Sequence, residues 1–265
     1  MRSDCRTVSG KRKRGKDRRL IDQMEKYIDI HNHILPGTDD GAKDMEESLE
    51  MLRQAALQGT GSLILTPHQK PDRRCVSVQG AVERTARLQQ EAERRDIPVK
   101  LYSGGEVFYS LDIVERLEQG KAGTLAGSSY VLTEFLPGEE WNYIYNGAYE
   151  LAAAGYIPVI AHLERYMNVV SDFDRVEELK NIGCLIQVNA SDLPGLVAPL
   201  VKRAARRLVR EELADLVATD AHSASGSRTF NLEECAAWLK RKCSREYAER
   251  LLYANAAAIL DKKQI

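Results

Sequence analysis

Short apolar segments alternate with longer segments of helical periodicity along most of this chain. The apolar segments, which are candidate strands, are Tyr27–Ile30, Ser62–Thr66, Val99–Ser103, Tyr130–Thr133, Ile157–Ala161, Leu185–Val188 and Leu216–Ala218. The segments with helical spacing between and after them are residues 44–58, 78–95, 110–119, 142–154, 172–182, 197–213 and 229–259. This alternation predicts a parallel sheet whose strands are connected by crossover helices.

Seven strand–helix units are enough to close into a barrel. The chain has 265 residues, which fits one α/β barrel of roughly 250 residues. We therefore expect a single α/β domain with a TIM-like (β/α)7 barrel. Asp44 followed by Glu47 has the form of a capping box before the first long helix. No segment approaches about 18 uninterrupted apolar residues, so no membrane-spanning helix is expected.

Charge is distributed unevenly along the chain. Residues 1–24 contain nine Lys or Arg and three Asp, a net charge of +6, whereas the remaining residues have a net charge of −7. We expect residues 1–24 to be a disordered basic leader and residues 25–265 to form the domain. Two interpretations of the leader stay open: a tail that contacts nucleic acid or an anionic surface, and an extension without a role. Met24 offers a second possible start of translation.

The cysteines form no CxxC pair and are odd in number: Cys5, Cys75, Cys184, Cys235 and Cys243. This usage is typical of a reducing compartment, so we expect a cytoplasmic protein. Cys235 and Arg241 match the C-x5-R spacing of thiol phosphatases. The residues between them are apolar helix formers without glycine, so we interpret Cys235 as a packed helix residue.

Each histidine follows a predicted strand by no more than four residues. The five histidines are His31, His33, His68, His162 and His222. Because the carboxyl ends of parallel strands converge on one face of a barrel, these imidazoles are predicted to share one site. The alternative is five separate histidines that cap helices or pair with surface acids.

Carboxylates occur at the same strand ends, in Asp39-Asp40-Gly41, Glu106, Glu134 and Asp220. For Glu106 and Glu134 the alternative is a carboxylate that stabilises a helix N-terminus. The side chains of His31 and His33 point to the same side of an extended chain and so can chelate one ion. Mixed nitrogen and oxygen ligands suit Zn, Mn or Fe. Nine such ligands suit two or three ions, and clustered metals are suited to phosphate-ester hydrolysis.

An ordered set of motifs resembles the PHP (polymerase and histidinol phosphatase) superfamily. Within it, the resemblance is to the bacterial metal-dependent protein tyrosine phosphatases of capsule and exopolysaccharide loci, the CpsB/YwqE type, from about Tyr27 onward. The motifs are His31-Asn32-His33, Asp39-Asp40-Gly41, Thr66-Pro67-His68, Gly105-Glu106, Glu134-Phe135, Ala161-His162-Leu163-Glu164-Arg165-Tyr166, Gln187-Val188-Asn189 and Asp220-Ala221-His222.

The resemblance implies a distorted (β/α)7 barrel with a trinuclear metal centre. It places His31, His33, Glu106 and Asp220 at one ion. Glu106 bridges to a second ion that Glu134 and His162 also hold, and Asp40, His68 and His222 hold the third. Arg165 and Arg228 match basic residues near the substrate phosphate. The alternative for Arg165 is an ion pair with a neighbouring acid such as Glu164, and for Arg228 a solvent-exposed loop residue.

The function that the resemblance implies is hydrolysis of phosphotyrosine on protein by a metal-activated hydroxide. The implied substrate is the autophosphorylated tyrosine kinase that regulates capsule or exopolysaccharide synthesis. Two or three divalent ions are expected, with Mn first and Fe, Co, Zn or Mg as alternatives. A phosphatase for a small phosphomonoester such as histidinol phosphate stays open, as does a nucleic-acid-tethered binding module without catalysis.

Overall fold

The computed structural model describes residues 27–71, 75–195 and 197–265, so the predicted leader over residues 1–24 lies outside the described part of the chain. Every strand pairing in the described ranges is parallel. The strands are β1 (Tyr27–Asp29), β2 (Thr60–Leu65), β3 (His68–Gln69), β4 (Lys100–Ser103), β5 (Glu106–Phe108), β6 (Tyr130–Glu134), β7 (Ile157–Ile160), β8 (Leu185–Asn189) and β9 (Leu216–Ala218). The predicted parallel sheet is confirmed.

The strands follow one another around a ring. One sheet has the order β1-β2-β4 and the other the order β3-β5-β6-β7-β8-β9. A parallel bridge between Asn32 and Ala221 joins the segment after β1 to the segment after β9 and so closes the ring. It is held by hydrogen bonds from the His33 N–H to the Ala221 carbonyl and from the Asp220 N–H to the His31 carbonyl, both 2.8 Å long.

Two of the predicted strands are each followed by a second, short strand. Thr66-Pro67 separates β2 from β3, and Gly104-Gly105 separates β4 from β5. A Cβ atom at Gly104 would lie 2.8 Å from Ile64 Cγ2, and one at Gly105 would lie 2.6 Å from the side-chain amide of Gln69. Glycine at these two positions therefore leaves room for the side chains of Ile64 and Gln69. When each pair is counted as one path, the barrel has the seven strands that the sequence predicts, in a distorted form.

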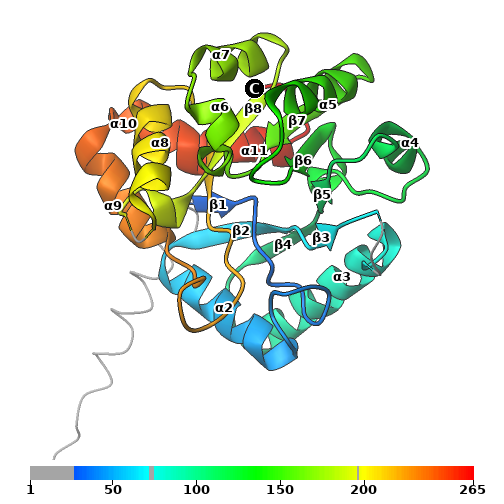
Figure 1. Ribbon diagram of the computed structural model, residues 1–265. Coiled ribbons are helices and arrows are strands. Elements are labelled where there is room, and N and C mark those ends of the chain that lie inside the picture. Colours follow the sequence, from blue (N-terminus) through cyan, green and yellow to red (C-terminus); the bar gives the residue numbers. More distant parts are fainter. Residues whose placement is uncertain (1–26, 72–74, 196) are drawn as a thin grey trace, which may run out of the picture.

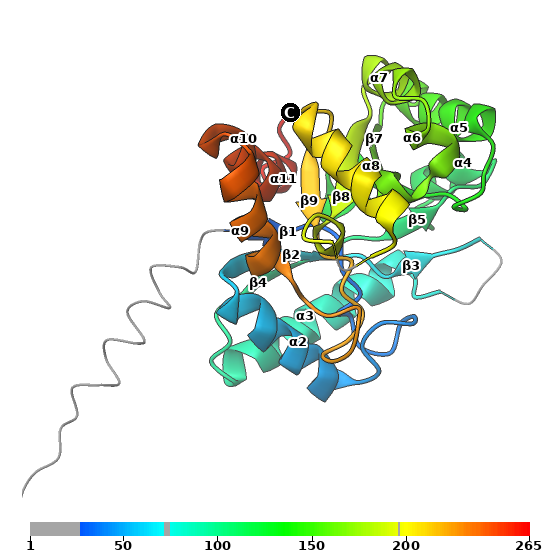
Figure 2. The same cartoon turned by 60° about the vertical axis from the view of Figure 1, so that its left-hand side comes forward.

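Helices cover the outside of the ring, and Figures 1 and 2 show α2 and α3 against one side and α5, α7 and α8 against the other. The α-helices are α2 (Met45–Leu57), α3 (Val78–Arg94), α4 (Ile113–Glu118), α5 (Trp141–Ala153), α6 (Met167–Val170), α7 (Asp174–Asn181), α8 (Pro199–Arg210), α9 (Leu232–Lys242), α10 (Arg245–Glu249) and α11 (Asn255–Leu260). The capping interaction predicted for Asp44 is present, since its carboxylate accepts the Glu47 N–H at 3.0 Å. No helix in the described ranges combines the length and apolarity needed to cross a bilayer.

The helical stretch predicted over residues 229–259 is divided into several helices. The chain becomes extended at Cys243, and Ser244 then caps a new helix by accepting the Tyr247 N–H. A π-turn, η4 (Arg250–Ala254), joins α10 to α11. The Ser244 side chain satisfies a free N–H at the start of α10, so a new helix begins directly after the extended residue Cys243.

Apolar side chains fill the interior of the ring, and the C-terminal helix closes one end of it. The interior cluster contains Ile28, Ile30, Ile64, Leu125, Tyr130, Leu132, Val159, Ala161, Leu185, Leu216, Ala218, Ala256 and Ile259. Ala256 and Ile259 come from α11, and Leu125 from the short turn η1 (Leu125–Gly127), which precedes β6. This end, where the strands begin, is therefore packed with hydrocarbon, and the polar site lies at the opposite end.

Candidate metal centre

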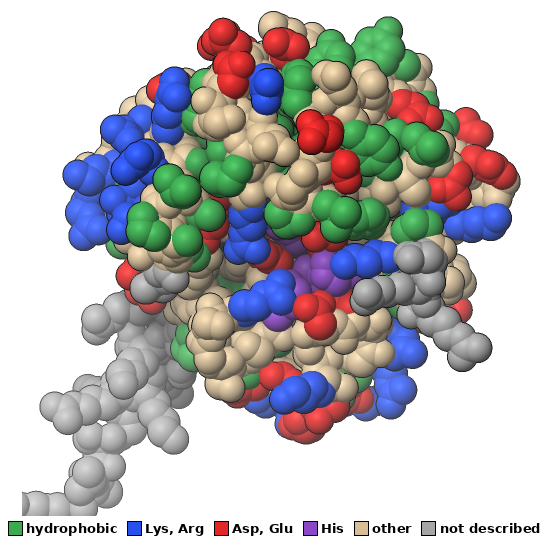
Figure 3. Space-filling view, viewed as in Figure 1, with side chains coloured by type: hydrophobic (Ala, Val, Ile, Leu, Met, Phe, Trp, Pro, Cys, Tyr) green, Lys and Arg blue, Asp and Glu red, His purple; other side chains and the backbone are tan. Residues whose placement is uncertain are grey.

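Most of the predicted ligands lie at the carboxyl ends of strands. β1, β6, β7 and β9 each deliver a ligand at or soon after their last residue. His68 and Glu106 come shortly after β2 and β4, as the first residues of β3 and β5, and Asp40 lies in the loop between β1 and α2. Figure 3 shows the imidazoles inside a hollow in the surface, with Lys, Arg, Asp and Glu side chains around it. The five histidines thus share one site, and the alternative of five unrelated histidines is wrong.

One group of possible donors consists of His31, His33 and Asp220. Their ligand atoms all lie within 4.8 Å of one another. Asp220 Oδ1 lies 3.6 Å from His31 Nε2 and 3.5 Å from His33 Nε2. Asp220 adopts the left-handed backbone region, with φ of 52°, which is uncommon for a residue with a side chain. Its conformation turns the carboxylate toward the two imidazoles.

Glu106 occupies the middle of the site. Its Oε1 lies 3.3 Å from His31 Nε2 and 3.2 Å from His162 Nε2. Its Oε2 lies 3.4 Å from His33 Nε2 and 2.8 Å from His68 Nδ1. The two oxygens therefore face different pairs of imidazoles, which is the arrangement that a carboxylate needs to connect two neighbouring ions.

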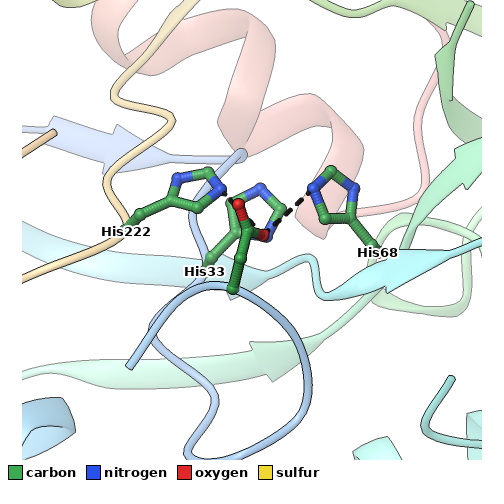
Figure 4. Close-up of side chains that lie close together, drawn as sticks. His33, His68 and His222 are labelled. Carbon is green, nitrogen blue, oxygen red and sulfur yellow. Dashed lines mark ion pairs between the residues drawn. The ribbon is translucent and has the colours of Figure 1, made fainter. Parts of the chain in front are cut away.

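Two further groups surround Glu106. Glu134 forms one with Glu106 and His68, and Asp40 forms the other with His33, His68 and His222. Asp40 Oδ1 lies 3.4 Å from His68 Nε2 and 3.5 Å from His222 Nε2. Figure 4 shows His33 between His68 and His222. His68 thus belongs to two groups, one more than the resemblance implied.

His162 belongs to none of the three groups found among the described residues. It still faces the site, because its Nε2 lies 3.2 Å from Glu106 and 4.0 Å from Glu134. His162 has φ of 37°, in the left-handed region, at the turn that leaves β7.

Side chains behind the imidazoles fix their orientation. His31 Nδ1 is 3.0 Å from Gln187 Oε1, and His33 Nδ1 is 2.8 Å from Asp39 Oδ2. These contacts place the proton on Nδ1 and leave each Nε2 as a free donor atom toward the centre. Sequence reasoning gave no role to Gln187 or Asp39; a buried amide in an apolar strand was the available signal.

Asp29 is a further residue that sequence reasoning missed. It is fully buried and accepts hydrogen bonds from the Thr219 N–H at 3.0 Å, the Thr219 hydroxyl at 2.7 Å and the Asn32 amide at 3.1 Å. Burial raises the pKa of Asp29 to about 6, against the opposing effect of these bonds. Asp29 joins β1 to the segment after β9 and so holds together the two segments that supply His31 and Asp220.

The electrostatics of the site suit cations. Burial opposes charge, yet neighbouring histidines lower the pKa of Asp220 and of Glu106 well below their usual ranges. Burial and His33 together lower the pKa of His222 to about 3. Burial and Glu106 raise the pKa of Glu134. The acids and imidazoles therefore lie so close together that the hydrogen bonds among them do not offset the cost of burying all of these ionisable groups.

Buried polar atoms without hydrogen-bond partners indicate whether these residues suit divalent ions. Among the described residues, thirteen buried side-chain nitrogen or oxygen atoms have no hydrogen-bond partner. Six of them belong to the ligand set, namely His31 Nε2, His33 Nε2, His68 Nδ1, His162 Nδ1, Glu106 Oε2 and Glu134 Oε2. Unpartnered buried groups are unfavourable, and imidazole and carboxylate donors are the ligands that Mn, Fe and Zn accept. The residues fit bound divalent metals.

Both predicted arginines reach the site. Arg228 Nη1 lies 3.1 Å from Asp40 Oδ2, and Nη2 lies 2.5 Å from His222 Nε2. Arg165 forms ion pairs with Asp220 at 3.5 Å and with Asp192 at 3.6 Å, rather than with Glu164. The two guanidinium groups line one cavity of about 180 Å³ beside the ligands. They are therefore placed to receive an anion.

Cys235 is a packed residue of α9, as its sequence context predicted. Its side chain has no exposed surface, and burial raises the pKa of its thiol. A nucleophilic cysteine needs an accessible thiolate of lowered pKa. Chemistry based on Cys235 is therefore excluded.

The fold and the site together define a class, the parallel α/β barrels with a cluster of histidines and carboxylates at the strand ends. Within this class, the chain belongs to the family described as "Capsular polysaccharide synthesis, CpsB/CapC", which matches residues 27–261. The predicted family is thereby confirmed.

Two relatives illustrate the family. The tyrosine-protein phosphatase CpsB of Streptococcus agalactiae is 31% identical over 245 residues, which cover 90% of this chain and all of the relative. The tyrosine-protein phosphatase YwqE of Bacillus subtilis is 32% identical over 238 residues, which cover 90% of this chain and 93% of the relative.

Solved structures agree with this placement. A structure from a study of YwqE from Bacillus subtilis and CpsB from Streptococcus pneumoniae, described as unique metal-dependent tyrosine phosphatases, superimposes with a TM-score of 0.84 at 32% identity, covering 90% of this chain and 96% of the other. The histidinol phosphate phosphatase of Lactococcus lactis superimposes with a TM-score of 0.54 at 12% identity, covering 82% and 94%. That second likeness concerns the fold alone.

Proposed function

We propose that this chain is a metal-dependent phosphatase that hydrolyses phosphotyrosine on protein. The observation that carries the proposal is Glu106, a buried carboxylate whose two oxygens face four imidazoles. The family relatives that match over nine tenths of the chain are named tyrosine-protein phosphatases. The barrel, the donor groups and the buried Cys235 all support hydrolysis without a thiol.

The proposed centre holds three divalent ions, with Mn as the expected metal. His31, His33, Glu106 and Asp220 would hold the first ion. Glu106, Glu134 and His162 would hold the second, and Asp40, His68 and His222 the third. His68 belongs both to the group with Glu106 and Glu134 and to the group with Asp40, which supports a compact cluster.

The bound ions supply two things: they lower the pKa of a water to near neutrality, and they stabilise negative charge on phosphoryl oxygens. The chain positions the substrate. Arg165 and Arg228 donate N–H groups to the phosphoryl oxygens, and a guanidinium suits this task because its fork matches two oxygens at once. Gln187 and Asp39 hold the proton on the Nδ1 of His31 and of His33.

The leaving group explains why no general acid is required. A tyrosine phenol has a pKa of about 10, so its phenolate leaves without prior protonation far more readily than an alkoxide. A protein-borne phosphotyrosine also needs an open site, and histidine side chains are visible at the bottom of the hollow seen in Figure 3.

The proposed partner is a tyrosine-phosphorylated protein, namely the autophosphorylated kinase that regulates capsule or exopolysaccharide synthesis. The description of the family supports this setting. The scattered cysteines, of which the four in the described ranges are free thiols, support a cytoplasmic location.

The test is hydrolysis of a phosphotyrosine peptide by protein stripped with a chelator and then reloaded with Mn. Turnover that disappears with the chelator and returns with Mn is expected. Histidinol phosphate serves as the competing substrate, and a higher kcat/KM for it would replace the proposed substrate with a small phosphomonoester. Absence of turnover on both substrates in the fully reloaded protein would refute phosphatase activity.

A further inference from the structure

Two fully buried carboxyl groups lie next to Arg165 and have no part in the proposed ligand set. Glu164 belongs to the turn η2 (Leu163–Arg165) after β7, and Asp192 ends the turn η3 (Ala190–Asp192) after β8. Glu164 Oε1 accepts the Asn189 N–H at 2.8 Å, and Asp192 Oδ1 accepts the Ser191 hydroxyl at 2.6 Å. Buried acids are unfavourable unless they are paired, so their remaining contacts are informative.

The second oxygen of Asp192 faces Arg165. Arg165 Nε lies 3.6 Å from Asp192 Oδ2, while its Nη1 lies 3.5 Å from Asp220 Oδ2. Asp192 Oδ2 has no hydrogen-bond partner elsewhere in the described chain. The guanidinium is therefore held between a carboxylate of the proposed metal centre on one side and Asp192 on the other.

The contacts of Asp192 leave one of its oxygens for Arg165. Its Oδ1 is fixed by the Ser191 hydroxyl, and its Oδ2 forms an ion pair with Arg165. The negative charge of Asp192 is therefore directed at the guanidinium.

We propose that Asp192 is the positioning residue that holds the Arg165 guanidinium toward the phosphoryl group. This inference rests on the proposed phosphate-binding role of Arg165. The Arg165 side chain is 36% exposed, and a free arginine loses rotamer entropy when it is fixed. Asp192 fixes it before the substrate arrives, so this loss does not reduce phosphate affinity.

The main test is a double-mutant cycle of Asp192→Asn and Arg165→Ala in the Mn-loaded enzyme. In the presence of Arg165, Asp192→Asn is expected to lower kcat/KM for a phosphotyrosine peptide about tenfold and to weaken binding of inorganic phosphate by a similar factor. In the Arg165→Ala background, the same change should have less than about a twofold effect. Equal factors in both backgrounds would overturn the inference.

Ser191 provides a second test. Ser191→Ala removes the hydroxyl that fixes Asp192 Oδ1, so the affinity for inorganic phosphate should fall about threefold in the presence of Arg165 and stay unchanged in the Arg165→Ala background. Unchanged phosphate affinity in the folded Ser191→Ala variant would contradict the inference.

Asp215→Asn is the matched control. Asp215 pairs with Lys180 at 2.7 Å and precedes β9, at the opposite end of the strands. It should lower the melting temperature without changing phosphate affinity. Phosphate binding by calorimetry separates the two proposals. If phosphate binding by the parent depends on Asp192 but the parent does not hydrolyse phosphotyrosine, only the proposed function fails. If the parent hydrolyses phosphotyrosine and Asp192→Asn is unchanged, only the inference fails.

Discussion

The two ends of the barrel satisfy their buried polar groups in opposite ways. Where the strands begin, large side chains donate to backbone carbonyls: Tyr247 donates to the Ala214 carbonyl at 2.9 Å, Asn255 to the Asp215 carbonyl at 2.8 Å and Tyr130 to the Lys263 carbonyl at 2.9 Å. Where the strands end, six buried donor atoms of the ligand set have no partner within the described chain.

This difference separates stability from function along one axis of the molecule. The end closed by α11 gains free energy from buried hydrocarbon and completed hydrogen bonds. The other end holds buried acids and imidazoles whose polar atoms the protein alone does not fully pair. A bound cation would pair these atoms, so metal binding and stability are linked at this end only.

The largest expected effect lies at the ligand end. Glu106→Gln removes the charge that connects the donor groups, and kcat/KM on a phosphotyrosine peptide should fall at least about a thousandfold, equivalent to about 4 kcal/mol. Bound Mn, counted by elemental analysis, should fall in parallel. Glu115→Gln, an exposed position on α4, is the control. Full metal content with normal kcat/KM in Glu106→Gln would exclude the central role of this carboxylate.

A change at the closed end should affect stability alone. Ile259→Ala removes a buried side chain of α11 and should reduce the free energy of unfolding by about 2–5 kcal/mol, because it leaves a cavity. Denaturant unfolding measures this loss, and kcat of the folded protein should not change. Leu57→Ala, at a position that is 66% exposed, should have little effect. A loss of kcat at unchanged stability would contradict the separation of the two ends.

The smallest of these effects concerns the guanidinium group of Arg228. Arg228→Lys keeps the positive charge but loses the planar fork, so phosphate affinity should fall about tenfold, or about 1.4 kcal/mol. Competition by inorganic phosphate in steady-state kinetics measures it, with the exposed Arg241→Lys as the matched change. An unchanged inhibition constant would mean that Arg228 does not contact the phosphoryl group.

The sequence predicted the ring and the cluster of histidines and carboxylates because both leave local signals. A histidine that follows an apolar strand lies at the carboxyl edge of the sheet, independently of contacts made elsewhere. The short strands β3 and β5 left a weaker signal, since Gly104 and Gly105 make room for the side chains of Ile64 and Gln69, which lie far away in the sequence.

The residues behind the ligands were not predictable in the same way. Asp29 pairs with Thr219, 190 positions away, and Gln187 with His31, 156 positions away. No periodicity relates such pairs. The break between α9 and α10 was missed because helical spacing on both sides of Cys243 suits one helix or two, and the choice depends on how Ser244 caps the second.

The bridge between Asn32 and Ala221 determines when the site can form during folding. Its hydrogen bonds use the backbone of His33 and Asp220, so the contact that closes the ring also brings first and last ligands together. Such long-range pairing has a large loop-closure entropy and forms slowly. The donor group of His31, His33 and Asp220 cannot form until the nascent chain has been synthesised past Asp220. Tight ion binding by that group therefore reports completed folding.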